Sequence, residues 1–201
     1  MVDDLRMTQE RKNVRIHETA IVEDGAKIGE GTSIWHHAHV RNDSELGKGC
    51  ILGKGVYIDA GVKIGNGVKI QNRVSVYHGV TVGNNVFLGP HMVFTNDLYP
   101  RAFNQEWKIV ETKVEDGVSI GANSVIICGV TLGKFCMIGS GSVVTKDIPP
   151  HALVFGNPAK IRGYVCKCGM KKFSIDEKPE DDDYSKFICE NCEKTLQGWV
   201  K

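Results

Sequence analysis

The sequence lacks several features that would each define a class of protein. No apolar run approaches the ~18 consecutive residues that a membrane-spanning helix needs, and the first residues include no apolar stretch typical of a signal peptide. An excess of charge is also missing, because 25 Lys and Arg stand against 24 Asp and Glu. There is no basic stripe with interleaved aromatic residues. We therefore expect a cytoplasmic globular protein that binds neither nucleic acid nor a membrane.

The seven cysteines do not have the pattern of a disulfide framework. Their number is odd and four of them cluster near the C-terminus, which favours thiols and metal ligands over disulfides. The other three occupy small-residue or corner positions of the repeat described below. We interpret these three as packing residues: Cys50, Cys128 and Cys136.

Two close cysteine pairs near the C-terminus have the spacing of a metal site. One residue separates Cys166 from Cys168, two separate Cys189 from Cys192, and twenty lie between the pairs. Four such thiolates can bind one Zn²⁺ tetrahedrally, and a module of about forty residues scarcely forms a core without a ligand of this kind. We predict a structural zinc site in a ribbon-like module over residues 164–201. The alternative is four unliganded thiols.

What the sequence does contain is an apolar side chain at every sixth position. The series runs from Ile16 to Phe94 without a missed step and resumes in a new frame from Val114 to Val144. Gly or Asn recurs three residues after these positions, as at Gly25 and Asn85, and both tolerate the left-handed backbone of a tight corner. The two frames are separated by an insertion over residues 95–113.

A period of six fits neither a helix nor a simple strand, whose apolar faces repeat every 3.6 and every 2 residues. It fits a solenoid in which each hexapeptide is one short strand plus one corner, so that three hexapeptides form a triangular coil of about 18 residues. We predict an all-β parallel β-helix of about six to seven coils over residues 16–163. A charged extension over residues 1–15 precedes it.

Residues 18 apart return to the same edge of such a coil, so the spacing predicts which side chains stack. Two columns are relevant to function. The first consists of Asp24, Asn42, Ala60, His78 and Asn96, and the second consists of His36, Lys54, Asn72 and Pro90. The first column places His78 about one strand spacing, ~4.8 Å, below Asn96.

The repeat and the segment after it resemble the hexapeptide-repeat acyltransferases, whose β-helix is left-handed. Gly156-Asn157-Pro158-Ala159, preceded by the segment 143–149, matches the way these enzymes leave their last coil. In that family the segment lies beside the nucleotide of acyl-CoA, and the pantetheine runs along the late coils. The resemblance implies acetyl-CoA as co-substrate and assigns its contacts to Gly121, Ala122, Gly139, Ser140, Asn157, Pro158, Ala159, Lys160 and Arg162. The alternative for the two cations is that they are solvated surface charges.

Further segments resemble one branch of this family, the UDP-2-acetamido-3-amino-2,3-dideoxyglucuronate N-acetyltransferases. They are residues 34–36, 70–77 and 93–96, followed by Pro100-Arg101-Ala102. The resemblance implies acetyl transfer to the 3-amino group of a nucleotide-linked amino sugar, with Asn96 close to that amine. It also implies a homotrimer with sites between subunits. The insertion contains Leu98, Tyr99, Phe103 and Trp107, which in such a trimer would pack on a neighbouring subunit; the alternative is a solvent-facing omega loop. The candidate substrate ligands are Arg101, Gln71, Asn72 and His36.

Acetyl transfer to an amine gives Asn96, His78 and Arg101 different candidate roles. The Asn96 amide does not titrate near neutral pH, so its oxygen can orient the amine but cannot take the proton. The proton goes to the leaving thiolate or to His78, since imidazole titrates near neutrality. Arg101 suits a substrate carboxylate or diphosphate because its planar fork binds oxyanions with two hydrogen bonds. Its alternative is an ion pair with Glu106 or Glu111.

Three other functions are compatible with a hexapeptide solenoid. A γ-type carbonic anhydrase-like zinc lyase needs three histidine ligands; His78 and His91 could be two of them, but no third has a matching place in the repeat. An acetyltransferase could instead act on a dTDP-linked amino-dideoxyhexose, which lacks the carboxylate. A purely architectural solenoid would bind no acetyl-CoA.

Overall fold

The computed structural model describes residues 13–104, 106, 108–177 and 184–193. Most of the expected N-terminal extension, Trp107 of the insertion and the acidic run at residues 180–183 lie outside the described residues, so the expectations about them stay predictions.

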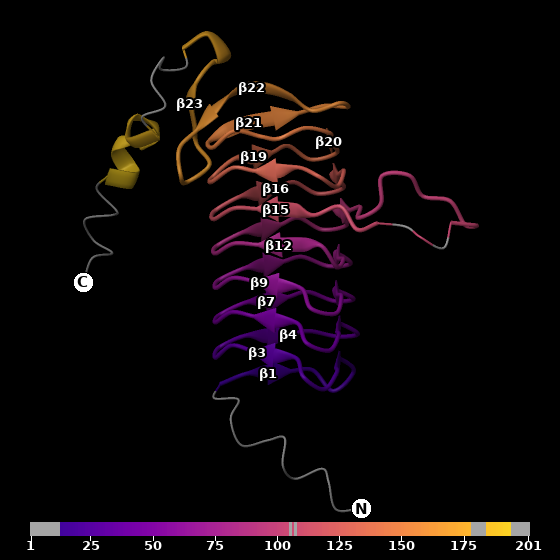
Figure 1. The fold of residues 1–201 in the computed structure, drawn as a ribbon. Coiled ribbons are helices and arrows are strands. Elements are labelled where there is room, and N and C mark those ends of the chain that lie inside the picture. Colours follow the sequence, from indigo (N-terminus) through magenta and orange to yellow (C-terminus); the bar gives the residue numbers. More distant parts are fainter. Residues whose placement is uncertain (1–12, 105, 107, 178–183, 194–201) are drawn as a thin grey trace, which may run out of the picture.

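The chain winds into a triangular prism of three sheets (Figure 1). Sheet A contains β1 (Arg15–Ile16), β4 (Ser33–Ile34), β7 (Ile51–Leu52), β10 (Lys69–Ile70), β13 (Phe87–Leu88), β16 (Ser119–Ile120), β19 (Met137–Ile138), β21 (Ala152–Phe155), β22 (Lys160–Val165) and β23 (Lys171–Phe173). Sheet B contains β2 (Ile21–Val22), β5 (His39–Val40), β8 (Tyr57–Ile58), β11 (Ser75–Val76), β14 (Val93–Phe94), β17 (Val125–Ile126) and β20 (Val143–Val144). Sheet C contains β3 (Lys27–Ile28), β6 (Glu45–Leu46), β9 (Lys63–Ile64), β12 (Val80–Val82), β15 (Thr112–Val114) and β18 (Thr131–Leu132).

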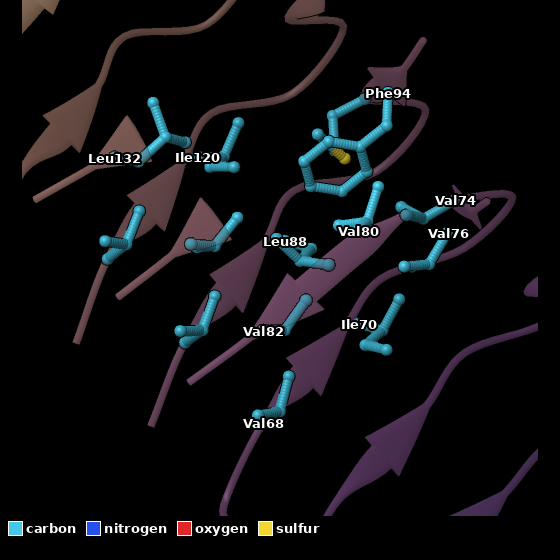
Figure 2. Close-up of a cluster of buried hydrophobic side chains, with 14 of the residues drawn as sticks. Val68, Ile70, Val74, Val76, Val80, Val82, Leu88, Phe94, Ile120 and Leu132 are labelled. Atoms are coloured by element: carbon cyan, nitrogen blue, oxygen red, sulfur yellow. The ribbon is translucent and has the colours of Figure 1, made fainter. Parts of the chain in front are cut away.

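The side chains spaced by six form the interior of the prism. Ile28 is in register with Leu46, and Leu46 with Ile64, so these positions stack as the period predicts. Figure 2 shows the interior near the middle of the stack, where Ile70, Val76 and Val82 come from the three different sheets. Each fully buried aliphatic side chain contributes about 1.5–3 kcal/mol to folding. This continuous core confirms the predicted all-β parallel solenoid; the stacking register is the same for either hand, so the left-handed winding stays a prediction.

The tight corners are more varied than the sequence analysis predicted. The glycines and asparagines three residues after the core positions do have positive φ, for example Gly49 at 66° and Asn85 at 54°. Six residues of other types adopt the same conformation at equivalent corners: His37, Asp43, Arg73, His91, Phe135 and His151. The tertiary winding therefore imposes the left-handed conformation even on side chains that disfavour it.

The insertion is two residues shorter than predicted. Thr112 and Lys113 belong to β15, because they pair with Val80 and Thr81 of β12. Residues 95–111 leave the prism between β14 and β15 and project sideways from it (Figure 1). The loop closes where Val110 N–H donates to Asn96 O over 3.0 Å.

The stack continues beyond the predicted last repeat. β21 pairs in parallel with β19 and gives sheet A an eighth parallel strand, although its sequence lies outside the strict period. β22 then turns back antiparallel to β21, and β23 pairs antiparallel with β22. The sheet thus crosses the expected boundary at residue 164. No helix in the described part of the chain could traverse a bilayer.

Candidate functional site

The corner at which the chain passes from sheet B to sheet C, here called the B–C edge, carries the first predicted column. His78 lies between Asn96 above and Ala60 below, as the 18-residue spacing predicts. The His78 Nδ1–H donates to Ala60 O over 2.8 Å. A neutral imidazole in this tautomer keeps an unprotonated Nε2, which can accept a proton.

Asn96 lies at the point where the inserted loop begins. Its Nδ2 donates to His78 O over 3.3 Å, and this contact assigns the orientation of the amide. The Asn96 Oδ1 is then an acceptor one coil above the His78 ring. The two neighbouring side chains therefore offer two hydrogen-bond acceptors and no acidic proton, an arrangement suited to an incoming amine.

Asp59 supports His78 from the coil below, which the sequence analysis missed. Its Oδ2 accepts from His78 N–H over 3.2 Å, and its Oδ1 accepts from Ala60 N–H, Tyr57 Oη and Arg41 Nη1 over 2.9–3.0 Å. Burial alone would raise the pKa of Asp59, but these four donors hold it below its ordinary value. A carboxylate with four donors fixes the backbone beneath His78.

Arg101 is exposed on the inserted loop. Its Nη1 donates to Pro100 O over 2.9 Å. In the described part of the chain no ion pair joins it to Glu106 or Glu111, so the alternative role does not occur within one subunit. The guanidinium can therefore meet an anion from outside the chain.

The three remaining substrate candidates meet at another edge. The corner between sheets A and B, the A–B edge, has an open pocket of about 280 Å³ lined by His36, Gln71 and Asn72 together with Trp35 and Lys54. The His36 ring stacks on His17 at 3.5 Å, and partial burial, with the charges of His17, His37 and Lys54, lowers the pKa of His36. Trp35 was expected only as part of the segment 34–36, and Lys54 had no predicted role.

One chain does not bring this pocket to His78 and Asn96. The two edges flank opposite sides of sheet B, and one side of the triangle, from His36 to Asn42, extends over six residues. At ~3.3 Å per residue, the two groups of candidates are up to roughly 20 Å apart within a subunit.

The predicted acetyl-CoA contacts lie higher on the same A–B edge. The N–H groups of Gly121 and Gly139 cannot serve, because they already donate to Ile138 O and Val154 O over 2.8 Å. Among the described residues, no acceptor lies on the N–H of Ala122 or Ser140.

A sequence signal distinguishes these available N–H groups. In lower coils the equivalent N–H of Lys54 donates to the Asn72 side chain one coil above, over 2.9 Å, and Lys48 donates likewise to Asn66. The residue 18 positions after Ala122 is Ser140, which provides no such cap. Where the residue 18 positions later is neither Asn nor Asp, the backbone N–H therefore stays available for a ligand.

The exit segment forms the turn of the β21–β22 hairpin beside these positions. Val143 N–H donates to Gly156 O over 2.9 Å, and Ala159 N–H donates to Val143 O over 2.8 Å. The Asn157–Pro158 bond is cis. Lys160 and Arg162 are exposed on β22, and the Arg162 guanidinium lies over the Phe155 ring, 5.4 Å from its centroid. The structure thus gathers the exit segment, two cations and the late-coil N–H groups at one end of the A–B edge.

The four C-terminal cysteines also converge. The Sγ atoms of Cys166, Cys168, Cys189 and Cys192 all lie within 4.8 Å of one another, and those of Cys168 and Cys189 are 3.8 Å apart. Four sulfurs at ~2.3 Å from a tetrahedral Zn²⁺ are separated by about 3.8 Å, so the cluster fits this ion. Burial disfavours the Cys166 thiolate, but the N–H groups of Cys168 and Cys189 outweigh it and lower the pKa of Cys166 to about 7.

The other three cysteines are buried, with exposed fractions of at most 4%, as their positions in the repeat predicted. Cys50 and Cys136 pack inside the prism, whereas Cys128 lies at the B–C edge one coil above Asn96, where its N–H donates to Thr95 Oγ1 over 2.9 Å.

Comparison with protein families resolves the class. The family of the bacterial transferase hexapeptide (six repeats) matches residues 25–60, 43–74, 61–95 and 111–146, more than half of the chain. The chain belongs to this family. The predicted resemblance is therefore confirmed, and the protein is an acyltransferase of the hexapeptide-repeat type.

Solved structures agree with this assignment of the hexapeptide transferase. A hexapeptide-repeat acetyltransferase from Vibrio cholerae O1 biovar eltor, complexed with acetyl-CoA, is 29% identical, with a TM-score of 0.55 over 61% of this chain and 70% of that one. A mutant GDP-perosamine N-acetyltransferase from Caulobacter crescentus, in complex with CoA and GDP-perosamine, is 25% identical, with a TM-score of 0.50 over 76% of this chain and 58% of that one.

The acetyltransferase domain of PglB from Neisseria gonorrhoeae FA1090 shares the fold at 23% identity, with a TM-score of 0.52 over 75% of this chain and 58% of that one. The hexapeptide transferase thus spans little more than half the length of the Caulobacter and Neisseria chains. A search of curated protein sequences finds no match.

Within one chain, His78 and His91 do not meet at a common metal site. His78 is on the B–C edge, whereas His91 is at a corner of the A–B edge. Within the described residues, the four cysteines form the one group of three or more such side chains close enough to share a metal ion.

Proposed function

We propose that this protein transfers the acetyl group of acetyl-CoA to the amino group of a nucleotide-linked amino sugar. The observation that carries the proposal is the pair of acceptors at the base of the inserted loop, Asn96 Oδ1 and His78 Nε2. The Vibrio relative binds acetyl-CoA and the Caulobacter relative binds CoA with an amino sugar nucleotide, which supports the substrate class. The first candidate substrate is UDP-2-acetamido-3-amino-2,3-dideoxyglucuronate.

In the proposed reaction, the amine nitrogen attacks the thioester carbonyl, the C–N bond forms and the C–S bond breaks. Asn96 accepts a hydrogen bond from the amine and aims its lone pair at the carbonyl. The amine proton passes to His78 Nε2 or to the departing CoA thiolate, and either transfer balances the reaction. Ala60 O holds His78 in the tautomer that leaves Nε2 free.

We propose that the active site is completed in a homotrimer. The outward positions of sheet B include Ile21 and Val93, which are 58% and 43% exposed in the single chain. The corresponding positions of sheet C carry charges such as Lys27, Glu45 and Lys63, which suit contact with water. An interface on sheet B would bring the A–B edge of one copy to the B–C edge and the exposed Tyr99 and Phe103 of the next.

A coupled assay for CoA release against a panel of UDP- and dTDP-linked amino sugars tests this function. We expect the highest kcat/KM for the 3-amino uronate. Arg101→Ala should raise the KM for this substrate and leave the KM for a dTDP-linked amino-dideoxyhexose unchanged, because only the sugar of the uronate has a carboxylate. Equal rates on all amines, or preference for a dTDP-linked sugar, would favour the alternative substrate.

His78→Gln separates the two fates of the proton. If His78 is the acceptor, the variant loses the acidic limb of the kcat/KM profile against pH and most of its rate. An unchanged profile would assign the proton to the CoA thiolate.

We further propose that the cysteine cluster binds one structural Zn²⁺ and that the enzyme works in the cytoplasm. Metal analysis should find one zinc per chain that survives His78→Ala and disappears with Cys189→Ser. The opposite result would support the lyase. No step of the acetyl transfer uses this metal, since four cysteine ligands leave no open position for substrate.

A further inference from the structure

Strand β22 connects the two C-terminal sites. Its first residues close the exit hairpin, where Phe155 pairs with Lys160 and Val154 with Ile161. Its last residue, Val165, leads directly into the ligand Cys166. A change in the position of the cysteine knuckle is therefore transmitted along one six-residue strand to the exit segment.

The hairpin end of β22 holds both predicted phosphate ligands. Arg162 lies on the ring of Phe155, and a Cβ atom added at Gly139 would be 2.8 Å from the Cβ of Phe155. Phe155 thus holds the guanidinium near the coil that contains Gly139. The neighbouring Lys160 is exposed on the same strand.

The metal end of β22 is fixed to the prism by a different set of contacts. Val165 N–H donates to His151 O over 2.8 Å, and His151 Nδ1 donates back to Val165 O over 2.9 Å. Phe187, which comes two residues before Cys189, is fully buried and contacts the rings of His151, Tyr164 and Phe173 at 5.2–5.6 Å.

The cysteine ligands connect the two segments of this module. Cys189 N–H donates to Cys166 Sγ over 3.1 Å. Residues 166–170 form a turn in which Cys166 N–H donates to Met170 O over 2.9 Å. Two short segments, separated by twenty residues between the cysteine pairs, thus meet at the sulfurs.

We propose that Zn²⁺ on the four cysteines clamps β22 and thereby positions Arg162 and Lys160 for the 3′-phosphate of acetyl-CoA. This inference rests on the proposed use of acetyl-CoA. With the metal bound, the segment with Phe187 is held over the end of the prism and β22 stays in register with β21. Without it, the two segments separate and the hairpin end of β22 loses its fixed position, while the coils below keep their own core.

The test measures the affinity of the metal-loaded and metal-stripped protein for CoA and for 3′-dephospho-CoA by calorimetry. Stripping should weaken CoA binding about tenfold, the size of one charge-assisted hydrogen bond, and dephospho-CoA binding much less. Adding back Zn²⁺ or Co²⁺ should restore the CoA affinity, and Co²⁺ should give thiolate charge-transfer absorption. Far-UV circular dichroism should show that the parallel coils remain folded throughout.

Cys192→Ser provides the matched variant and Cys50→Ala the control, because Cys50 is a buried thiol in a low coil, outside the cluster. The first should lose zinc and CoA affinity, and the second should keep both. Equal CoA affinity with and without metal would overturn the clamp alone. The same holds if metal removal weakens CoA and dephospho-CoA binding equally, or if it unfolds the whole prism. A zinc-loaded protein that binds no CoA would overturn both this inference and the proposed function.

Discussion

The B–C edge carries side chains at positions where the other two edges mostly carry glycine. At the position after the core residue, nine sites in sheets A and C have glycine: Gly29, Gly47, Gly53, Gly65, Gly83, Gly89, Gly121, Gly133 and Gly139. The exceptions in these repeats are His17, Trp35, Gln71 and Glu115. The same position in sheet B has Glu23, Arg41, Asp59, Tyr77 and Thr95. A Cβ atom at Gly53 would be 2.6 Å from the Asn72 side chain of the next coil, and one at Gly121 would collide with Ser140.

The difference teaches where this fold can place reactive side chains. At the two glycine edges the coils approach so closely that mainly backbone groups face a ligand, which suits the long pantetheine arm of acetyl-CoA. The B–C edge leaves room for the Asp59 network and for His78 above it. We therefore expect the reacting side chains at the B–C edge and backbone recognition of acetyl-CoA at the upper coils of the A–B edge.

Asn96→Ala removes the side chain that completes the B–C edge and should have the largest effect. We expect kcat/KM to fall about 100-fold, because the amine loses its orienting acceptor, with little change in Tm. Asn42→Ala is the control, since Asn42 is half-buried in the same column three coils lower. Full activity of the Asn96 variant would contradict our placement of the amine.

Asp59→Asn tests whether the side-chain network stabilises this edge. An amide cannot accept from all four donors, because its NH₂ group must face either the His78 N–H or the donors on Oδ1. The free energy of unfolding should therefore fall by about 1–3 kcal/mol at pH 7. Because the pKa of Asp59 is lowered in the fold, its contribution is present above the unfolded value of ~3.9 and disappears as pH falls through the folded value.

Urea unfolding of both proteins at neutral and at acidic pH measures this difference. The two stability curves should converge below about pH 4. A gap that persists in acid would show that the network does not depend on the ionised carboxylate.

Gly121→Ala tests the close approach at the glycine edge. The added methyl group must displace Ser140, which should cost about 1–3 kcal/mol and weaken acetyl-CoA binding nearby. Gly141→Ala is the matched comparison: nothing lies within 4 Å of its added Cβ, but its φ of 70° costs an L-residue roughly 1–2 kcal/mol. Thermal unfolding should give Gly121→Ala the lower Tm of the two variants if the contact between coils costs more than the backbone strain at residue 141.

Much of the architecture could be predicted because a strict period converts sequence distance into spatial position. The stacking of His78 beneath Asn96 followed from a spacing of 18, and the cysteine cluster followed from the two short pairs. The support from Asp59 could not be predicted in the same way, since it depends on a side chain reaching across to the coil above. The eighth strand, β21, was missed because it pairs by position and does not follow the repeat.

The sequence by itself determined the interior line of the prism, the columns along its edges and the family, since six-residue spacing and corner residues leave few other windings. Only the tertiary structure decided which backbone N–H groups remain available, which His78 nitrogen is free and that Asp59 supports the backbone of His78. These features depend on hydrogen bonds between neighbouring coils, whose geometry is set when the coils pack together.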